Sequence, residues 1–190
     1  YIKVMNPTSN KSDFEDLTTN LKDLAYSYLE KYNPSKQQLK VYLLKKYLTK
    51  IKGSKSKKEV TSIIDKIVLN LEQHRFLNDE LYSDSKARMY LRRGYSLNKI
   101  NQSLRSKGIE DKHVQKSINK IKENQIEPDF VSALKLCKRR RIGPLRPDSN
   151  RELFYKKDMG ILARGGFSFD LSKRVLELEK DEFNKLLKIV

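Results

Sequence analysis

The sequence has one cysteine, few helix-breaking residues and no long hydrophobic run. Its single cysteine, Cys137, excludes an intrachain disulfide and is typical of a reducing cytoplasm, where we expect this chain to act. Cys137 shares a helical stripe with Phe130 and Leu134, so we expect it in the core. No apolar run approaches the roughly 20 residues that a membrane-spanning helix needs, so we expect no membrane association. The 7 Gly and 5 Pro leave few interruptions to helices.

The residues from which catalytic and metal sites are built are also scarce. The chain has two histidines, His74 and His113, and neither belongs to a His-Glu-x-x-His pair. Two glycines have the spacing of a phosphate-binding loop, but Gly166 and Phe167 stand where that loop needs a lysine and a hydroxyl residue. We therefore expect a protein that is not an enzyme and that uses no cofactor or metal ion.

Charge is abundant and unbalanced. The chain has 41 Lys and Arg against 24 Asp and Glu, a net charge of +17. Such self-repulsion favours an anionic partner, and nucleic acid is the commonest one. The alternative is that an AT-rich genome fills solvated positions with lysine, which explains the lysines better than the arginines.

Apolar residues recur at helical spacing along most of the chain. Over residues 14–32 they lie three or four positions apart, as on one face of an amphipathic helix. Ser35 with Gln38 and Ser56 with Glu59 form capping-box patterns that predict the starts of two further helices. The first third of the chain is thus predicted to form three helices.

The same order of helices recurs twice, which predicts an all-α fold of three tandem three-helix repeats stacked into an elongated, curved array. The junctions at 29–35, 91–96 and 162–168 each end in a serine placed to cap the next helix. The expected parts are a flexible N-terminal segment and three repeats: 1–12, 13–76, 77–127 and 128–190. The alternative is a compact helical bundle with accidental self-similarity.

The third repeat is longer than the second, because Ser96 and Ser168 are farther apart in the sequence than Ser35 and Ser96. The extra residues fit the stretch 143–150, which contains two prolines. This stretch is predicted to split the first helix of the third repeat in two.

Basic residues gather at predicted helix ends in the second and third repeats. Cations stabilise a helix C-terminus by roughly 0.3–1 kcal/mol through the helix dipole, so part of this pattern is ordinary helix stabilisation. The four consecutive basic residues at 138–141 exceed that need and favour a polyanion; the alternative is a solvated helix end. Further basic residues continue the third repeat: Arg146, Arg151, Lys156, Lys157 and Arg164. The linker 52–58 is a weaker case, and the alternative there is a disordered loop.

Four short segments of the second and third repeats carry a family resemblance. They are Phe-Leu-Asn-Asp at 76–79, Leu-Arg-Arg-Gly-Tyr-Ser at 91–96, Leu-Arg-Ser-Lys-Gly-Ile at 104–109, and Leu-Ala-Arg-Gly-Gly-Phe-Ser-Phe-Asp at 162–170. In their order and spacing, together with the three-repeat arrangement, they resemble the RecX family of recombination regulators. The resemblance covers residues 20–187.

This resemblance implies a protein without catalytic activity that binds RecA and lies in the groove of the RecA filament on single-stranded DNA. There it would restrain ATP hydrolysis, strand exchange and co-protease action. We expect a monomer that binds naked DNA weakly. The family motifs are expected to be architectural: Asn78 or Asp79 as a helix cap, Gly94 and Gly108 as turn residues, and Tyr95 and Phe167 packed between helices.

The contact surface is inferred from charge, and we expect one continuous basic ridge. The expected RecA- and DNA-binding residues lie in the second and third repeats: Arg88, Arg92, Arg93, Lys99, Arg105, Lys138, Arg139, Arg140, Arg141, Arg164, Lys173 and Arg174. The first repeat departs from the pattern, because Tyr-Asn-Pro-Ser at 32–35 replaces the arginine-containing junction of the other two.

Two other functions fit the same sequence. A helix-turn-helix regulator would bind duplex DNA tightly and with sequence selectivity. A helical scaffold for acidic proteins would act without any dependence on DNA.

Overall fold

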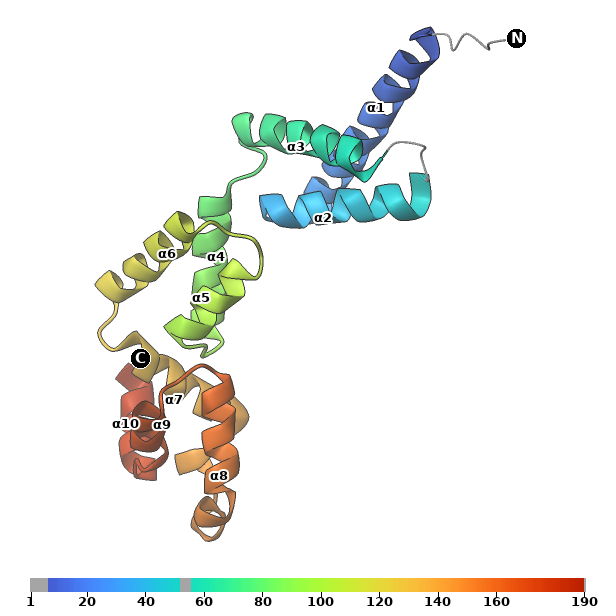
Figure 1. Ribbon diagram of the computed structural model, residues 1–190. Helices are drawn as coiled ribbons and strands as arrows, with labels where there is room; N and C mark the ends of the chain where they lie inside the picture. The colour runs from blue at the N-terminus through green and yellow to red at the C-terminus, as the bar shows by residue number, and fades with distance from the viewer. Residues whose placement is uncertain (1–6, 52–55, 190) are drawn as a thin grey trace. The chain divides into compact units, whose positions relative to one another are not determined.

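The structure, a computed structural model, describes residues 7–51 and 56–189, with side chains for 14–49 and 56–189. These residues form helices joined by turns and include no strand, so the prediction of an all-α, repeated helical array is confirmed (Figure 1). The helices are α1 Pro7–Lys31, α2 Lys36–Lys46, α3 Lys57–Gln73, α4 Asp79–Arg92, α5 Leu97–Arg105, α6 Asp111–Asn124, α7 Pro128–Arg140, α8 Asp148–Arg164, α9 Phe169–Leu176 and α10 Lys180–Ile189. Among the described residues, no helix combines the length and hydropathy of a membrane span.

The predicted serine caps are confirmed. Ser35, Ser96 and Ser168 immediately precede α2, α5 and α9, and each serine has an extended backbone. Each hydroxyl accepts a hydrogen bond from the amide three residues on, at 3.2, 3.1 and 3.3 Å respectively. Ser56 caps α3 in the same way, with Glu59 completing the capping box.

Some helix boundaries differ from those expected from the sequence, and some expected segments lie outside the described residues. Helix α1 begins at Pro7, inside the segment that we expected to be flexible, and residues 1–6 lie outside the described residues. Of the basic linker, residues 52–55 also lie outside them, and Lys57 begins α3. Helix α2 is followed directly by a π-helical segment, Tyr47–Ile51. Between α7 and α8 lies a single 3-10 turn, Gly143–Leu145.

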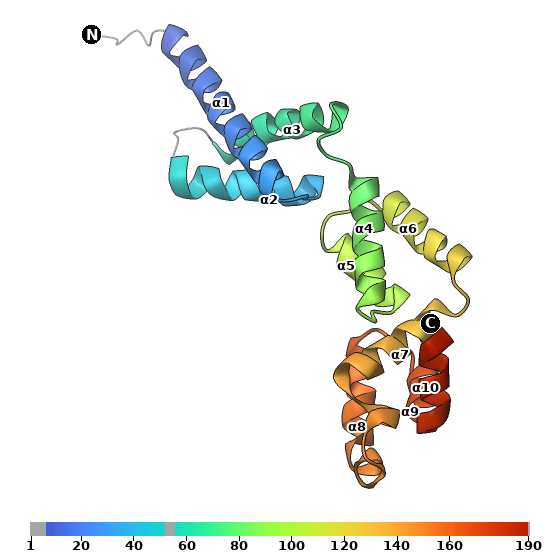
Figure 2. The same cartoon turned by 180° about the vertical axis from the view of Figure 1, so that it is seen from behind.

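The described residues up to Tyr82 form a compact N-terminal unit. Its α1 packs across both α2 and α3, which lie side by side (Figures 1 and 2). The core between them consists of aliphatic side chains such as Leu21, Leu39, Leu43 and Ile64. Close packing of these branched side chains fixes the crossing of the three helices.

Residues 83–190 form a compact C-terminal unit. Its α9 packs against both α7 and α8, around a core that includes Leu134, Cys137, Leu162 and Phe183. Cys137 is fully buried, so its predicted place in the core is confirmed, and this burial raises the pKa of its thiol to about 12. The division into two units does not test the repeat boundaries at 76 and 127, which stay a prediction.

Two helices, α2 and α5, each have their N-terminal cap completed by an aspartate that lies later in the chain. The Asp79 carboxylate accepts a hydrogen bond from the first helical amide of α2, that of Lys36, at 2.9 Å. The Asp129 carboxylate accepts the equivalent bond from Leu97 of α5, at 2.7 Å. A carboxylate at a helix N-terminus is also stabilised by the helix dipole. The bonds join residues 43 and 32 positions apart in the sequence. They connect the start of α2 to the start of α4, and the start of α5 to the start of α7.

Replacing Asp129 with alanine should lower the free energy of unfolding by about 1–2 kcal/mol, because the Leu97 amide loses a charged acceptor in a half-buried place. Urea denaturation monitored by circular dichroism measures the loss. Glu123→Ala, which removes one carboxylate from an exposed position of α6, is the control and should change stability by less than about 0.5 kcal/mol. Equal losses in the two variants would contradict the proposed role of Asp129.

Candidate functional site

The turn between α4 and α5 rests directly on α7. Gly94 has φ +75°, a conformation that suits glycine, and Gly108 has the same φ after α5, so both are confirmed as turn residues. A Cβ at Gly94 would lie 2.7 Å from the Leu136 amide nitrogen and 2.8 Å from the Ser132 carbonyl oxygen. The absence of a side chain therefore allows the two backbones to approach.

The turn between α8 and α9 contacts the start of α5, directly after the turn that contains Gly94. The Ser96 amide donates a hydrogen bond to the Gly165 carbonyl oxygen, at 3.2 Å. Gly166 has φ +87°, and a Cβ there would overlap the Ser96 hydroxyl and lie 2.9 Å from the Lys99 Cβ. Two glycine turns more than 60 residues apart in the sequence thus touch at the start of α5.

These contacts bring the start of α5 and the ends of α7 and α8 around one hollow of about 340 Å³, which we call the basic hollow. Its lining contains four of the twelve predicted binding residues and, among the described residues, no Asp or Glu. The lining residues are Tyr95, Lys99, Leu136, Arg139, Arg140, Ile161, Arg164 and Gly165. The structure therefore brings together cations that the sequence places on three different helices.

Four further predicted residues flank the lining residues in sequence and are exposed: Arg92, Arg93, Lys138 and Arg141. Arg141 ends α7 in the left-handed conformation, with φ 53°. In the part of the chain that the structure describes, none of these four, nor the four cations of the hollow, has an acidic side chain within ion-pair distance. Their charge is left to solvent or to a partner.

The other four predicted residues are absent from the lining of the basic hollow, and the continuous ridge of all twelve stays a prediction. Arg105 makes a two-point ion pair with Asp111, at 3.0 and 3.1 Å. Lys173 lies 3.9 Å from the Glu177 carboxylate. Arg88 lines a separate hollow beside Asp84, between α4 and α6. Sequence reasoning missed these acidic neighbours, because only the folded chain shows which carboxylates they face.

Arg174 is held by two contacts within the unit. Its guanidinium donates to both carboxylate oxygens of Glu127, at 2.8 and 3.2 Å, and lies 4.1 Å from the centre of the Phe130 ring. The hydrogen bonds lower the pKa of Glu127 and raise that of Arg174. This geometry fixes Arg174 against α7 and makes it a structural residue.

Two other basic residues of the third repeat also hold the fold together. Arg146 donates to both oxygens of the buried Asp158 carboxylate, at 2.6 and 2.7 Å, and that carboxylate also accepts from the Gly143 amide. The hydrogen bonds from Arg146 to Asp158 raise the pKa of the arginine. Arg151 donates to the carbonyl oxygens of Leu176, the last residue of α9, and of Leu178, two residues beyond it.

The family motifs have the architectural roles expected of them. The Asn78 side chain caps α4 by accepting from the Leu81 amide, at 3.0 Å. Phe167 is buried in the core of the C-terminal unit. Tyr95 is half-buried, and its ring lies parallel to that of Tyr90, with 5.3 Å between ring centres and 4° between planes. Tyr95 therefore packs on α4 and lines the basic hollow at the same time.

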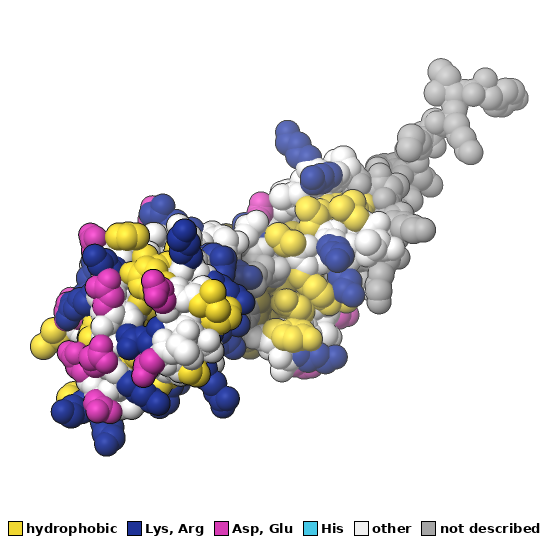
Figure 3. All heavy atoms as spheres, turned by 90° about the horizontal axis from the view of Figure 1, so that it is seen from below, with side chains coloured by type: hydrophobic (Ala, Val, Ile, Leu, Met, Phe, Trp, Pro, Cys, Tyr) yellow, Lys and Arg dark blue, Asp and Glu magenta, His cyan; other side chains and the backbone are white. Residues whose placement is uncertain are grey.

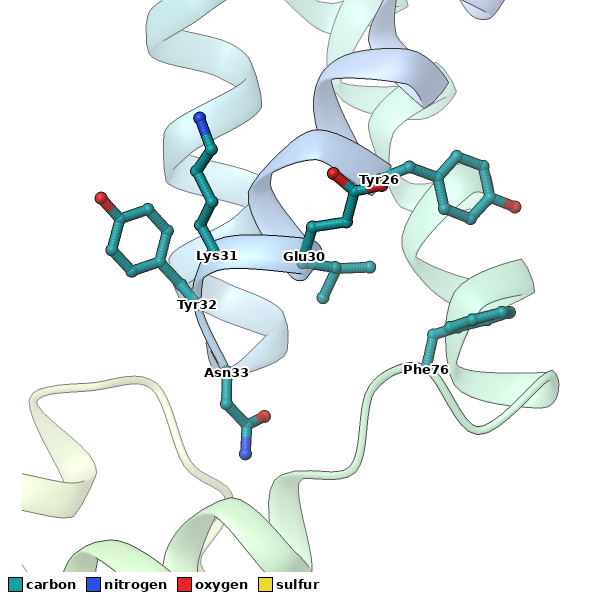
Figure 4. A pocket seen from close by; sticks show the side chains of 7 residues that line it. Tyr26, Glu30, Lys31, Tyr32, Asn33 and Phe76 are labelled. Atoms are coloured by element: carbon teal, nitrogen blue, oxygen red, sulfur yellow. The ribbon is translucent and has the colours of Figure 1, made fainter.

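A second hollow, of about 570 Å³, lies in the N-terminal unit at the end of α1. Tyr26 and Phe76 approach edge to face on one side, and Lys31 and Tyr32 project on the other (Figure 4). It contains one lysine and one glutamate, Glu30, and none of the predicted binding residues. Its lining is mainly aromatic, without the surplus of positive charge that marks the basic hollow.

Another view of the surface shows both signs of charge. The face shown in Figure 3 carries Lys and Arg interspersed with Asp and Glu. Residues 83–190 contain 26 of the 41 Lys and Arg and 14 of the 24 Asp and Glu. Among the described residues no cluster of His, Cys, Asp and Glu could hold a metal ion. The concentration of unpaired cations at the two glycine turns is thus a local feature.

The comparisons with known proteins agree in one name. The family model described as "RecX, second three-helix domain" matches residues 78–118. A "Regulatory protein RecX" of Myxococcus xanthus (strain DK1622) is 33% identical over 161 residues, which cover 84% of this chain and 85% of that relative. Another, of Streptococcus uberis, is 30% identical over 129 residues, 66% of this chain and 47% of the relative.

Among solved structures, the crystal structure of RecX from Lactobacillus salivarius matches with a TM-score of 0.58 and 17% sequence identity. The match covers 93% of this chain and 99% of that one. At this identity the likeness shows the fold alone. It supports the helical array independently of the sequence motifs.

Replacing Arg146 with alanine should destabilise the C-terminal unit by about 3 kcal/mol, because it leaves the Asp158 carboxylate buried without its cation. Arg140→Ala removes a cation that has no acidic partner among the described residues, and should change stability by less than about 0.5 kcal/mol. Thermal and urea unfolding of the two variants measure this difference. A loss for Arg140→Ala as large as that for Arg146→Ala would show that the hollow cations also hold the fold.

Proposed function

Because this chain belongs to the RecX family of regulatory proteins, we propose that it regulates the RecA recombinase, mainly as an inhibitor. It acts in the cytoplasm as a monomer without catalytic activity of its own. It binds in the groove of the RecA filament on single-stranded DNA and restrains ATP hydrolysis, strand exchange and co-protease activity. Its binding to naked DNA is weak.

One observation supports this proposal most strongly: eight cations that have no acidic partner among the described residues line the basic hollow or flank its lining residues in the sequence. A partner that presents many negative charges in sequence, such as a nucleoprotein filament, can contact several of them at once. Each exposed contact is weak, and their sum gives useful affinity. Such binding falls steeply with salt, because each phosphate contact releases a condensed counterion.

Binding of this kind restrains a filament mechanically. A protein that contacts neighbouring RecA subunits, or a subunit and the DNA strand, opposes the rearrangement that ATP hydrolysis and strand exchange require. The inhibitor needs no catalytic group for this effect, since it acts through its differential affinity for one filament state.

Changing the four residues 138–141 to glutamate should weaken inhibition of the DNA-dependent ATPase of RecA by at least about tenfold in the concentration for half-inhibition, because the surface then repels phosphates. The measurement is ATP turnover by RecA on single-stranded DNA with increasing amounts of the chain. The control changes four exposed lysines outside the hollow to glutamate, with the same change of net charge: Lys122, Lys156, Lys185 and Lys188.

Inhibition that is equal in the two variants would remove the cluster at 138–141 from the interface. The same assay separates the two rival functions. Tight, sequence-selective binding to duplex DNA without an effect on RecA would favour a helix-turn-helix regulator. Binding to an acidic protein that is unchanged by DNA would favour a scaffold.

A further inference from the structure

We propose that the basic hollow holds one unpaired nucleotide of single-stranded DNA, with the base stacked on Tyr95 and the flanking phosphates on Lys99, Arg139, Arg140 and Arg164. The inference rests on the proposed function, which names the whole filament as the partner. The inference goes further and assigns this surface to the DNA strand of that filament. It does not require RecA to be present. The hollow, at about 340 Å³, is at the lower end of the size range of small-ligand sites.

The aromatic ring in the hollow is held in a fixed orientation. Tyr95 follows Gly94, whose backbone is pressed against α7, and its ring lies parallel to Tyr90 of α4. The same ring lines the hollow. A base that enters would extend the stack of two tyrosines, and little side-chain freedom would be lost on binding, since the ring is already ordered.

The cations in the hollow favour phosphate. Three guanidinium groups and one ammonium share its lining, and none has an acidic partner among the described residues. Their mutual repulsion is relieved when anions bind between them. The planar fork of an arginine matches two oxygens of a phosphate, and successive phosphates of one strand provide several anions at short intervals.

The combination of ring and cations favours an unpaired strand over the other polyanions. A duplex covers the faces of its bases with neighbouring base pairs, so it offers phosphates but no base to Tyr95. An acidic protein segment offers carboxylates but leaves the stacked ring without a specific partner. The hollow of Figure 4 has three aromatic residues but one lysine balanced by one glutamate, so it serves as the internal comparison.

The test compares two labelled oligonucleotides by fluorescence anisotropy at low salt, without RecA. One is a short oligothymidylate, and the other has the same length and charge but carries abasic sites in place of bases. The unaltered chain should bind the base-bearing strand about tenfold more tightly. Tyr95→Leu should abolish this preference and leave the affinity for the abasic strand unchanged, whereas Tyr95→Phe should retain the preference.

Two matched controls accompany these variants. Tyr32→Leu removes an exposed tyrosine at the corresponding junction of the N-terminal unit and should keep the preference for bases. Arg140→Glu should weaken binding of both strands by about tenfold or more, whereas Lys122→Glu, with the same change of charge on α6, should have a much smaller effect.

Four outcomes would overturn the inference. A base preference that survives Tyr95→Leu would place stacking elsewhere, and equal effects of Arg140→Glu and Lys122→Glu would reduce the binding to net charge. Loss of both strands in Tyr95→Leu, with an unchanged circular dichroism spectrum and melting temperature, would contradict a role limited to the base. If RecA inhibition persists while the base preference is absent, this inference fails and the proposed function stands.

Discussion

The contact between two glycine turns is the constraint on which the arrangement of the C-terminal unit depends. Gly94 lets the turn after α4 touch the backbone of α7, and Gly166 lets the turn after α8 touch Ser96 and Lys99. Basic residues accumulate at helix C-termini for a local reason, the helix dipole. They become one surface with Lys99, in the first turn of α5, because the ends of α7 and α8 meet the start of α5 at these turns. A side chain at either glycine would separate the helices and disperse the charge.

The charged residues of this unit divide into two groups with different physical roles. Arg146, Arg151 and Arg174 pair with carboxylates or carbonyl oxygens of the same unit and are part of the fold. The cations of the basic hollow have no such partners among the described residues, so their repulsion remains as a cost to the folded state until an anion binds. Such a surface suits the filament-binding role proposed above.

Much of the fold could be predicted from the sequence, because helical spacing and capping serines are local signals. Ser35, Ser96 and Ser168 cap helices as expected. The bonds of Asp79 and Asp129 to distant amides could not be foreseen, since they depend on packing between segments far apart in the chain. The candidate site could be predicted only in part, because it too depends on packing between distant segments. Runs of arginine and lysine showed where charge lies, but not which cations face a carboxylate.

Hydrogen–deuterium exchange of the chain, alone and on RecA–single-stranded DNA filaments, tests most directly the claim that the meeting point of the two turns is the contact surface. Protection on binding should concentrate in 93–99, 136–141 and 161–166, the segments that surround the basic hollow. Amides around Tyr26, Tyr32 and Phe76 should exchange as in the free chain. Protection confined to that aromatic region, or absent from all three segments, would contradict the account.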